Sequence, residues 1–156
     1  MKNDFRRGFT LIELLVVVAI IGILSSIVLS NLMGARVKSR DVTRKQNLDQ
    51  LVKATNLYYS QNGELPGVGG ECYHVLGSSP DSGISLATDL DPFMKDIPVD
   101  PMKGALGLNG NYVYNNVADD TGSFNFCAIM ENAGTGNGSY TDMCGDGTTY
   151  NYCVTQ

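Results

Sequence analysis

The sequence predicts an α+β fold in which one long N-terminal helix packs against a small antiparallel sheet. An apolar run begins at Phe9 and continues, with few interruptions, to Met33. An amphipathic helical pattern follows it, and the last third of the chain holds short β-favouring segments bounded by turn residues. A helix with one apolar stripe and a sheet with one apolar face can bury those surfaces against each other.

The apolar run is long enough to cross a membrane. Every residue from Leu14 to Leu24 is apolar or glycine, and the pattern resumes after Ser26 through Met33. A spanning helix needs about 20 such residues, whereas a cleaved secretory signal has an apolar core of about 7 to 15 and a small-residue cleavage site. No such site follows this run, so we expect a single-pass anchor with one soluble domain behind it.

The helix is expected to continue beyond the apolar run, from about Thr10 to Gln61. Asn62-Gly63 is a typical helix end, because glycine tolerates the left-handed conformation of a C-cap. No proline precedes Pro66. One helical face is marked by residues at i, i+3, i+4 and i+7 spacing, namely Leu48, Leu51, Val52, Thr55 and either Tyr58 or Tyr59.

The remaining elements are shorter. All five prolines lie in residues 63–110, which predicts an irregular connection, and Asp91-Pro92 resembles an N-cap that would start a helical turn reaching Lys95. Residues 111–131 read as a hairpin turning at 119–122, and residues 150–154 as a last strand. We therefore divide the chain into a basic leader (1–8), an apolar half-helix (9–35), an amphipathic half-helix (36–62), an irregular αβ-loop (63–110), and a sheet with a cysteine-containing C-terminal loop (111–156).

The cysteine pattern indicates an exported domain. All four cysteines follow the apolar run, and an even number in an exported domain favours two disulfides. Sequence alone does not choose among the three possible pairings. Free thiols or a zinc site are the alternatives, but the chain has no C-x-x-C pair and one histidine, His74. The cysteines concerned are Cys72, Cys127, Cys144 and Cys153.

The most informative residue is Glu13, a single carboxylate near the start of the apolar helix. A charge in such a helix is costly and is therefore expected to have a function. Its surroundings, Arg6-Arg7-Gly8-Phe9-Thr10-Leu11-Ile12-Glu13, resemble the start of type IV pilins, a family that includes the pseudopilins of type II secretion. The resemblance is specific over the first quarter of the chain, and the layout of long helix, loop and late-cysteine sheet extends it to a pilin-like fold.

The resemblance implies a processing and assembly route. A prepilin peptidase would cut after Gly8, and the new amino terminus at Phe9 would be N-methylated. Before assembly the chain would be a single-pass inner-membrane protein with its N-terminus in the cytoplasm, as the basic leader favours, and its head outside. Subunits would then leave the lipid, through an inner-membrane assembly platform, for a helical filament of identical subunits and minor pilins. That filament would be periplasmic or extracellular.

Within such a filament Glu13 can pair with the Phe9 amine of a neighbouring subunit. Each charge alone is costly in an apolar environment, so pairing would reward one axial register between subunits. A glutamate simply hydrated at the membrane interface is the alternative. The sequence departs from many family members in carrying Ser30, rather than a helix-loosening proline, within the apolar helix. Retention of Glu13 argues against a tip subunit of the kind that lacks it.

Charge is unevenly distributed behind the apolar run. Residues 36–63 carry six basic and two acidic side chains, whereas residues 64–156 carry two basic and twelve acidic ones. We expect the basic stretch Arg36–Lys45 either to face acidic residues of neighbouring subunits or to lie solvated near anionic lipid. The acidic residues considered are Asp89, Asp91, Asp96 and Asp100. Some pseudopilins hold calcium in a C-terminal loop, for which Asp142 and Asp146 are the candidates here, although the alternative is an ordinary turn.

Other functional classes are less well supported by the sequence. No Ser-His-Asp order, metal-binding histidine pair or phosphate loop indicates an enzyme. No basic aromatic patch in the head indicates direct binding of nucleic acid, and no cofactor motif is present. The main alternative is a membrane-anchored extracellular binding module, in which the apolar run is an uncleaved anchor. Neighbouring-gene context, not sequence, would separate a surface pilus from a secretion pseudopilus or a DNA-uptake filament.

Overall fold

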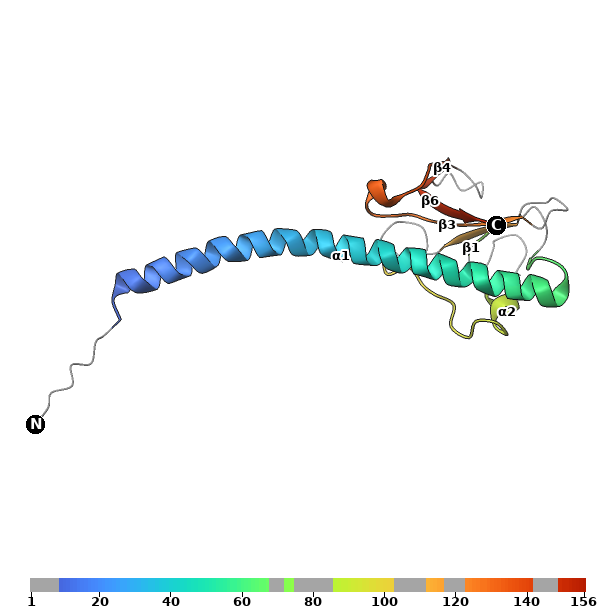
Figure 1. The fold of residues 1–156 in the computed structure, drawn as a ribbon, viewed down its shortest axis with the longest axis horizontal. Coiled ribbons are helices and arrows are strands. Elements are labelled where there is room, and N and C mark those ends of the chain that lie inside the picture. Colours follow the sequence, from blue (N-terminus) through green and yellow to red (C-terminus); the bar gives the residue numbers. More distant parts are fainter. Residues whose placement is uncertain (1–8, 68–71, 75–85, 103–111, 117–122, 142–148) are drawn as a thin grey trace, which may run out of the picture. The chain divides into compact units, whose positions relative to one another are not determined.

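The computed structural model describes residues 9–67, 72–74, 86–102, 112–116, 123–141 and 149–156. The chain divides into two compact units, Met1–Val37 and Lys38–Gln156, and we call the second unit the head. A long helix and a small antiparallel sheet confirm the predicted α+β class (Figure 1). The elements in chain order are α1 (Leu11–Asn62), β1 (Cys72–His74), α2 (Leu86–Leu90), β2 (Val113–Asn116), β3 (Phe124–Ala128), the 3-10 helix η1 (Ala133–Thr135), β4 (Tyr140–Thr141), β5 (Thr149–Tyr150) and β6 (Tyr152–Thr155).

Helix α1 contains 52 residues and ends where the sequence predicts. Gly63 has a φ of 77°, a conformation that glycine adopts without steric cost. Its N–H donates to the Tyr59 carbonyl at 2.8 Å, which satisfies one of the carbonyls left open at the helix end. The Asn62 side chain donates to the Tyr58 carbonyl at 3.0 Å. Asn62 and Gly63 together therefore form the predicted C-cap.

The amphipathic half of α1 supplies one wall of the main core. Its predicted face is confirmed, since Leu48, Leu51, Val52 and Thr55 are buried. Of the two tyrosines, Tyr58 packs against the core and Tyr59 is exposed. The reason is helical geometry, because residues 51, 55 and 58 follow one another at intervals of four and three and so stay on one stripe.

A four-stranded antiparallel sheet, in the order β1-β2-β3-β6, forms the other wall (Figure 1). The β2–β3 hairpin is confirmed, with Tyr114 opposite Phe126, although its turn lies outside the described residues. The ring centroids of Tyr114 and Phe126 lie 4.9 Å apart, a distance typical of packed aromatic pairs. The sheet residues that face α1 in the main core are Tyr112, Tyr114, Phe124, Phe126, Ala128 and Met130.

A second, smaller core involves Val113, Tyr150 and the Cys127–Cys153 pair, with Tyr140 packed against it. Strands β4 and β5 pair in their own two-stranded sheet, so Tyr140 and Tyr150 are cross-strand partners. The predicted last strand, 150–154, is in fact divided at Asn151 between β5 and β6. One continuous stretch of chain therefore serves two sheets.

The short helix of the connection lies earlier than the sequence predicted. Helix α2 ends at Leu90, so Asp91 and Pro92 follow a helix instead of starting one. Leu86 and Leu90 stand one turn apart and are both buried in the main core, which explains why the helix forms there. Pro92 has no N–H to donate to the fourth residue before it, which ends the helix. A single turn follows over the predicted position, in which the Phe93 and Met94 N–H groups donate to the Leu90 carbonyl at 2.9 and 2.8 Å.

Candidate functional site

The start of α1 is closed by a reciprocal pair of side chains, Thr10 and Glu13. The Thr10 N–H and hydroxyl donate to Glu13 Oε2 at 2.8 and 2.7 Å, and the Glu13 N–H lies 3.3 Å from the Thr10 hydroxyl oxygen. This arrangement is a capping box, in which each residue satisfies a backbone donor that a helix start leaves open. The pattern Thr-x-x-Glu at residues 10–13 is the local sequence signal for this capping box.

The other residues of the predicted assembly motif are described only in part. Gly8 and the basic leader lie outside the described residues. Phe9 immediately precedes the capping box and is 80% exposed. The peptidase and methylation assignments of Gly8 and Phe9 therefore stay predictions.

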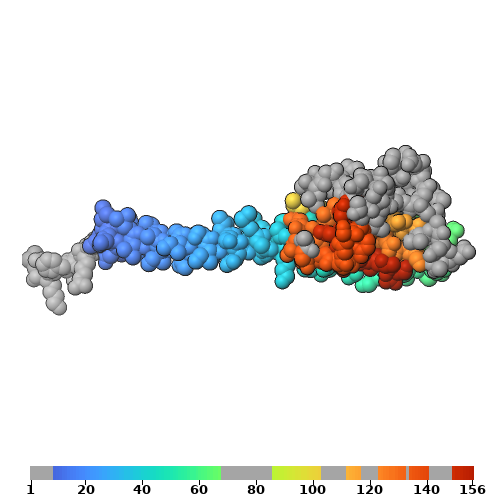
Figure 2. Space-filling model, turned by 90° about the horizontal axis from the view of Figure 1, so that it is seen from above, coloured from blue at the N-terminus to red at the C-terminus, as the bar shows by residue number. Residues whose placement is uncertain are grey.

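The apolar half of α1 exposes its side chains on every side. By length and composition α1 is long and apolar enough to cross a membrane, and none of its most apolar 18-residue window is buried. The blue part of Figure 2 shows these side chains uncovered in that view. Sixteen large apolar side chains from Leu11 to Met33 would be strongly unfavourable in contact with water, so this half requires an apolar environment.

The head contains a site that the sequence reasoning missed, a group of charged residues that we call the polar cluster. It consists of Arg40, Asp41 and Arg44 of α1, Asp100 of the αβ-loop, and Glu131 after β3. These five residues come from three segments far apart in sequence. The basic residues at 40 and 44 therefore pair within one chain, which corrects the expectation that they face neighbouring subunits or lie solvated. Asp100 is likewise an internal partner.

Arg44 occupies the centre of the polar cluster and is fully buried. Its Nε and Nη2 donate to the two oxygens of Asp100 at 2.7 and 3.0 Å, a bidentate pairing. Its Nη1 donates to Asp41 Oδ1 at 2.7 Å and to Glu131 Oε1 at 2.8 Å. Four hydrogen bonds to three carboxylates compensate the cost of burying the guanidinium.

Asp41 links α1 to the segment after β3, through hydrogen bonds to its backbone. It is 1% exposed and accepts hydrogen bonds from the Glu131 N–H at 2.9 Å and the Asn132 N–H at 3.1 Å. The Thr135 hydroxyl donates to its Oδ2 at 3.0 Å. The two N–H groups belong to the residues that directly precede η1, and Thr135 is its last residue. Asp41 therefore ties α1 to the segment from Glu131 to Thr135 as well as pairing with Arg44.

The pKa values of the polar cluster favour its charged forms. Burial opposes ionisation of Asp41, but hydrogen bonds from the Glu131 and Asn132 N–H groups outweigh it, so its pKa is lowered. A hydrogen bond from Arg40, joined by those from Arg44, lowers the pKa of Glu131 to about 2. Burial lowers the pKa of Arg44, but its hydrogen bonds to Asp100 and Glu131 raise that pKa by more, so the net shift is upward. Asp41, Arg44 and Glu131 thus stay ionised at neutral pH.

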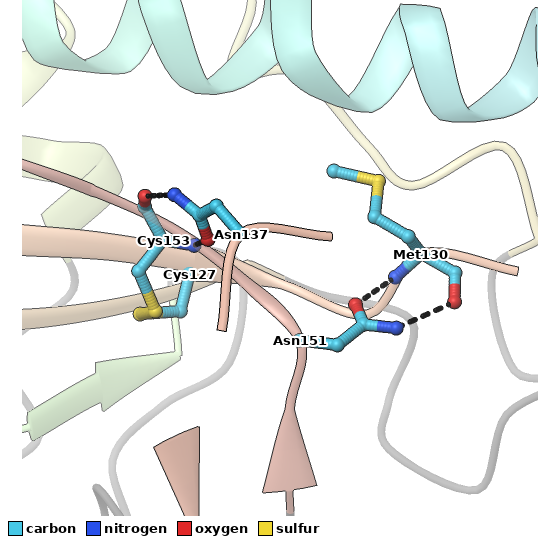
Figure 3. The surroundings of a disulfide bond; sticks show 5 residues. All are labelled: Cys127, Met130, Asn137, Asn151 and Cys153. Carbon is cyan, nitrogen blue, oxygen red and sulfur yellow. Dashed lines mark hydrogen bonds between the residues drawn. A yellow bond between two sulfur atoms is a disulfide. The ribbon is translucent and has the colours of Figure 1, made fainter. Parts of the chain in front are cut away.

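One of the expected disulfides is present, between Cys127 of β3 and Cys153 of β6 (Figure 3). The two residues are directly opposite in the antiparallel register, with their Cα atoms 4.1 Å apart. Cys144 lies outside the described residues, and the side chain of Cys72 is likewise not described. If a second disulfide forms, as the sequence predicts, these two cysteines are the remaining partners.

Two asparagine side chains hold β6 next to this disulfide (Figure 3). The Asn137 carboxamide donates to the Cys153 carbonyl at 2.6 Å and accepts from its N–H at 2.9 Å. The Asn151 carboxamide makes the same pair of bonds to the backbone of Met130, at 3.0 and 2.6 Å. Each carboxamide therefore takes the place of a neighbouring strand. Asn137 satisfies the backbone groups of Cys153 at the edge of the sheet, and Asn151 links the chain to Met130 at the point where β5 ends and β6 begins.

The calcium candidates Asp142 and Asp146 lie outside the described residues. Within the described part of the chain, no group of three or more histidine, cysteine or acidic side chains is placed to hold a metal ion. The three carboxylates of the polar cluster surround a guanidinium, which leaves them paired.

Comparison with known proteins identifies the family. The model of the prokaryotic N-terminal methylation motif matches residues 4–29, which include Gly8, Phe9 and Glu13. Type II secretion system core protein G of Escherichia coli is 30% identical over 99 residues, 64% of this chain and 68% of that protein. This chain belongs to the type IV pilin and pseudopilin family.

Two pilins show the same relationship over shorter lengths. The type IV major pilin PilA of Myxococcus xanthus is 37% identical over 81 residues, 52% of this chain and 35% of that protein. The wide pilus major component PilA4 of Thermus thermophilus is 43% identical over 62 residues, 40% of this chain and 46% of that protein. The chain therefore spans less than half the length of these two pilins. No solved structure matches this pilin-family chain.

Proposed function

We propose that this protein is a structural subunit of a pilus-like or pseudopilus filament, processed after Gly8, N-methylated at Phe9 and assembled through its N-terminal helix. The observation that carries the proposal is the methylation motif at residues 4–29, most of which lies in the exposed apolar half of α1. Cleavage after Gly8 would account for the basic leader in front of Phe9. Packing against identical helices would cover the apolar side chains of α1. The proposal requires no catalytic group and no cofactor.

Before assembly the apolar half lies in the cytoplasmic membrane. Lys2, Arg6 and Arg7 favour a cytoplasmic N-terminus, so the head lies on the outer side. Transfer from lipid to a bundle of identical helices leaves these side chains in apolar surroundings throughout. An inner-membrane platform and minor pilins are the partners such a transfer needs.

Glu13 is suited to pair with the Phe9 amine of a neighbouring subunit. In the single chain Thr10 donates only to Oε2, and no described residue donates to Oε1. One carboxylate oxygen can therefore fix the side chain at the helix start while the other accepts a neighbour's cationic amine. The amine exists only after cleavage, so the pair would couple processing to assembly.

The proposal is tested by Gly8→Val, Glu13→Ala and Glu64→Ala in the source organism, with Glu64 as an exposed acidic control in the head. Mass spectrometry of the N-terminus and the subunit content of sheared filaments are measured. We expect Gly8→Val to retain residues 1–8, Glu13→Ala to be cleaved but nearly absent from filaments, and Glu64→Ala to behave as wild type. Normal filaments from Glu13→Ala would refute the assembly role of Glu13. An uncleaved wild-type chain found only in membranes would refute the proposal that this protein is a filament subunit.

Between the possible filaments, we propose a secretion pseudopilus. The match to the E. coli protein G extends over 99 residues, against 81 and 62 residues for the two pilins, and is the longest of these three. Deleting the gene should then reduce the proteins released into the medium. Unchanged release together with loss of surface fibres would instead indicate a pilus.

A further inference from the structure

The contact between α1 and the rest of the head begins with a charge. Along α1, every residue up to Arg36 is exposed, and the first buried side chain is Asp41, followed by Arg44. The first buried apolar side chain, Leu48, comes two turns after Asp41. A stripe that binds a sheet through leucine and valine therefore starts with an aspartate and an arginine, where apolar side chains would be expected.

If this buried stripe began with apolar side chains, the position along α1 at which the contact with the head starts would be poorly defined. The helix before residue 37 is itself apolar, so an apolar boundary would let the head's contact shift along α1 at little cost. The polar cluster removes that freedom, because Asp41 must meet the N–H groups of Glu131 and Asn132, and Arg44 must meet Asp100. Buried ionic groups with satisfied hydrogen bonds are best attested as devices that fix register.

We propose that Asp41 and Arg44 are positioning residues that fix the point at which α1 becomes part of the head, so that opening of the helix from its apolar side stops there. The side chains of the apolar half are exposed, and it contains Gly22 and Gly34, which weaken a helix interior. Helices in proteins owe most of their stability to packing. That half is therefore the part of α1 that opens most readily, whereas residues 38–47 are held by the polar cluster.

The cluster can perform this role because it joins three segments at one level of the helix. Arg44 lies 56 residues from Asp100, and Asp41 lies 90 residues from Glu131. The Arg40 guanidinium also pairs with Glu131 through two nitrogens, one of them Nε at 2.7 Å. Turning residues 40–44 out of the helix would break all of these bonds together, which makes the boundary cooperative.

Hydrogen exchange on the full-length chain in detergent micelles tests the proposal. We expect Asp41→Asn, which keeps the shape of the side chain, to speed exchange in residues 38–47 by roughly 100-fold while β3 is much less affected. Arg36→Gln removes an exposed charge of the same helix and should change exchange by less than about twofold. Val52→Ala, which weakens the main core, should speed exchange across the whole head alike.

A double variant separates a joint device from two independent residues. If Asp41 and Arg44 act together, Asp41→Asn with Arg44→Met should speed exchange in residues 38–47 by much less than the product of the two single effects. The proposal is overturned if Asp41→Asn leaves residues 38–47 as protected as Arg36→Gln does. It is also overturned if exchange rises equally in β3, because the effect would then be on overall stability, as for Val52→Ala. Neither result depends on filament formation.

Discussion

The Cys127–Cys153 disulfide should stabilise the head by a measurable and calculable amount. The bond closes a loop of 26 residues. In the chain-entropy account, such a loop restricts the unfolded chain enough to contribute about 3.5 kcal/mol at 25 °C. For a head of about 120 residues this corresponds to roughly 10 to 15 °C in the midpoint of thermal unfolding.

The measurement uses a variant in which this is the only disulfide that can form, Cys72→Ala with Cys144→Ala. Its oxidised and reduced forms keep the same side-chain volume at Cys127 and Cys153, so no cavity complicates the comparison. Because the chain has no tryptophan, urea unfolding of the full-length protein in micelles is followed by near-ultraviolet circular dichroism of its tyrosines. We expect the reduced form to unfold at a clearly lower urea concentration.

The reasoning also fixes the result that would refute it. The β3–β6 pairing and the bonds from Asn137 to Cys153 persist without the covalent bond, so the native state should remain folded after reduction. A difference below about 1 kcal/mol between the two forms would show that the unfolded chain is not restricted as the entropy account requires. Absence of the 2 Da mass difference between the forms would show that the bond itself does not form.

Two further predictions concern the head. Because the folded-state pKa of Glu131 is about 2, below its ordinary value of 4.5, the stability it contributes is complete above about pH 4.5 and is lost as the pH falls toward 2. The urea midpoint should therefore fall over that window, and Glu131→Gln should flatten the fall; an unchanged profile would exclude this residue as the cause. Thr55→Val should raise the free energy of unfolding by about 1 kcal/mol, because the buried Thr55 hydroxyl has no hydrogen-bond partner among the described residues. The same change at Thr43, whose hydroxyl donates to the Ser39 carbonyl, is the control and should give no gain.

The features that sequence predicted well are those encoded locally. The Asn62-Gly63 helix end needs only the conformational freedom of one glycine, and the stripe from Leu48 to Tyr58 needs only helical periodicity. The β2–β3 hairpin follows from β-favouring residues on either side of a turn. In each case the residues that determine the structure are within a few positions of one another.

The polar cluster could not be found in that way. Apart from the Asp41–Arg44 pair, its bonds join residues 56 to 91 positions apart, and no local pattern indicates which distant acidic residue a given arginine will meet. The charge totals by segment, basic for residues 36–63 and acidic for residues 64–156, are arithmetically correct but hide the pairing of Arg44 with Asp100. A local signal did exist, since Asp41, Arg44 and Leu48 are spaced three and four residues apart and share one helical stripe. A charged residue on a core-facing stripe is expected to have a buried partner.

The two charged positions of α1 that sequence and structure single out act in different surroundings. Glu13 lies in the apolar half, is held by Thr10, and awaits a partner from another chain under the proposed function. Asp41 lies at the first buried position of the head and has all its partners within its own chain. Asp41, whose hydrogen-bond partners are all in its own chain, can fix the structure before assembly. Glu13, with one carboxylate oxygen still to be paired, can respond to assembly. If both roles hold, the length of α1 that is free to change during assembly is set between these two carboxylates.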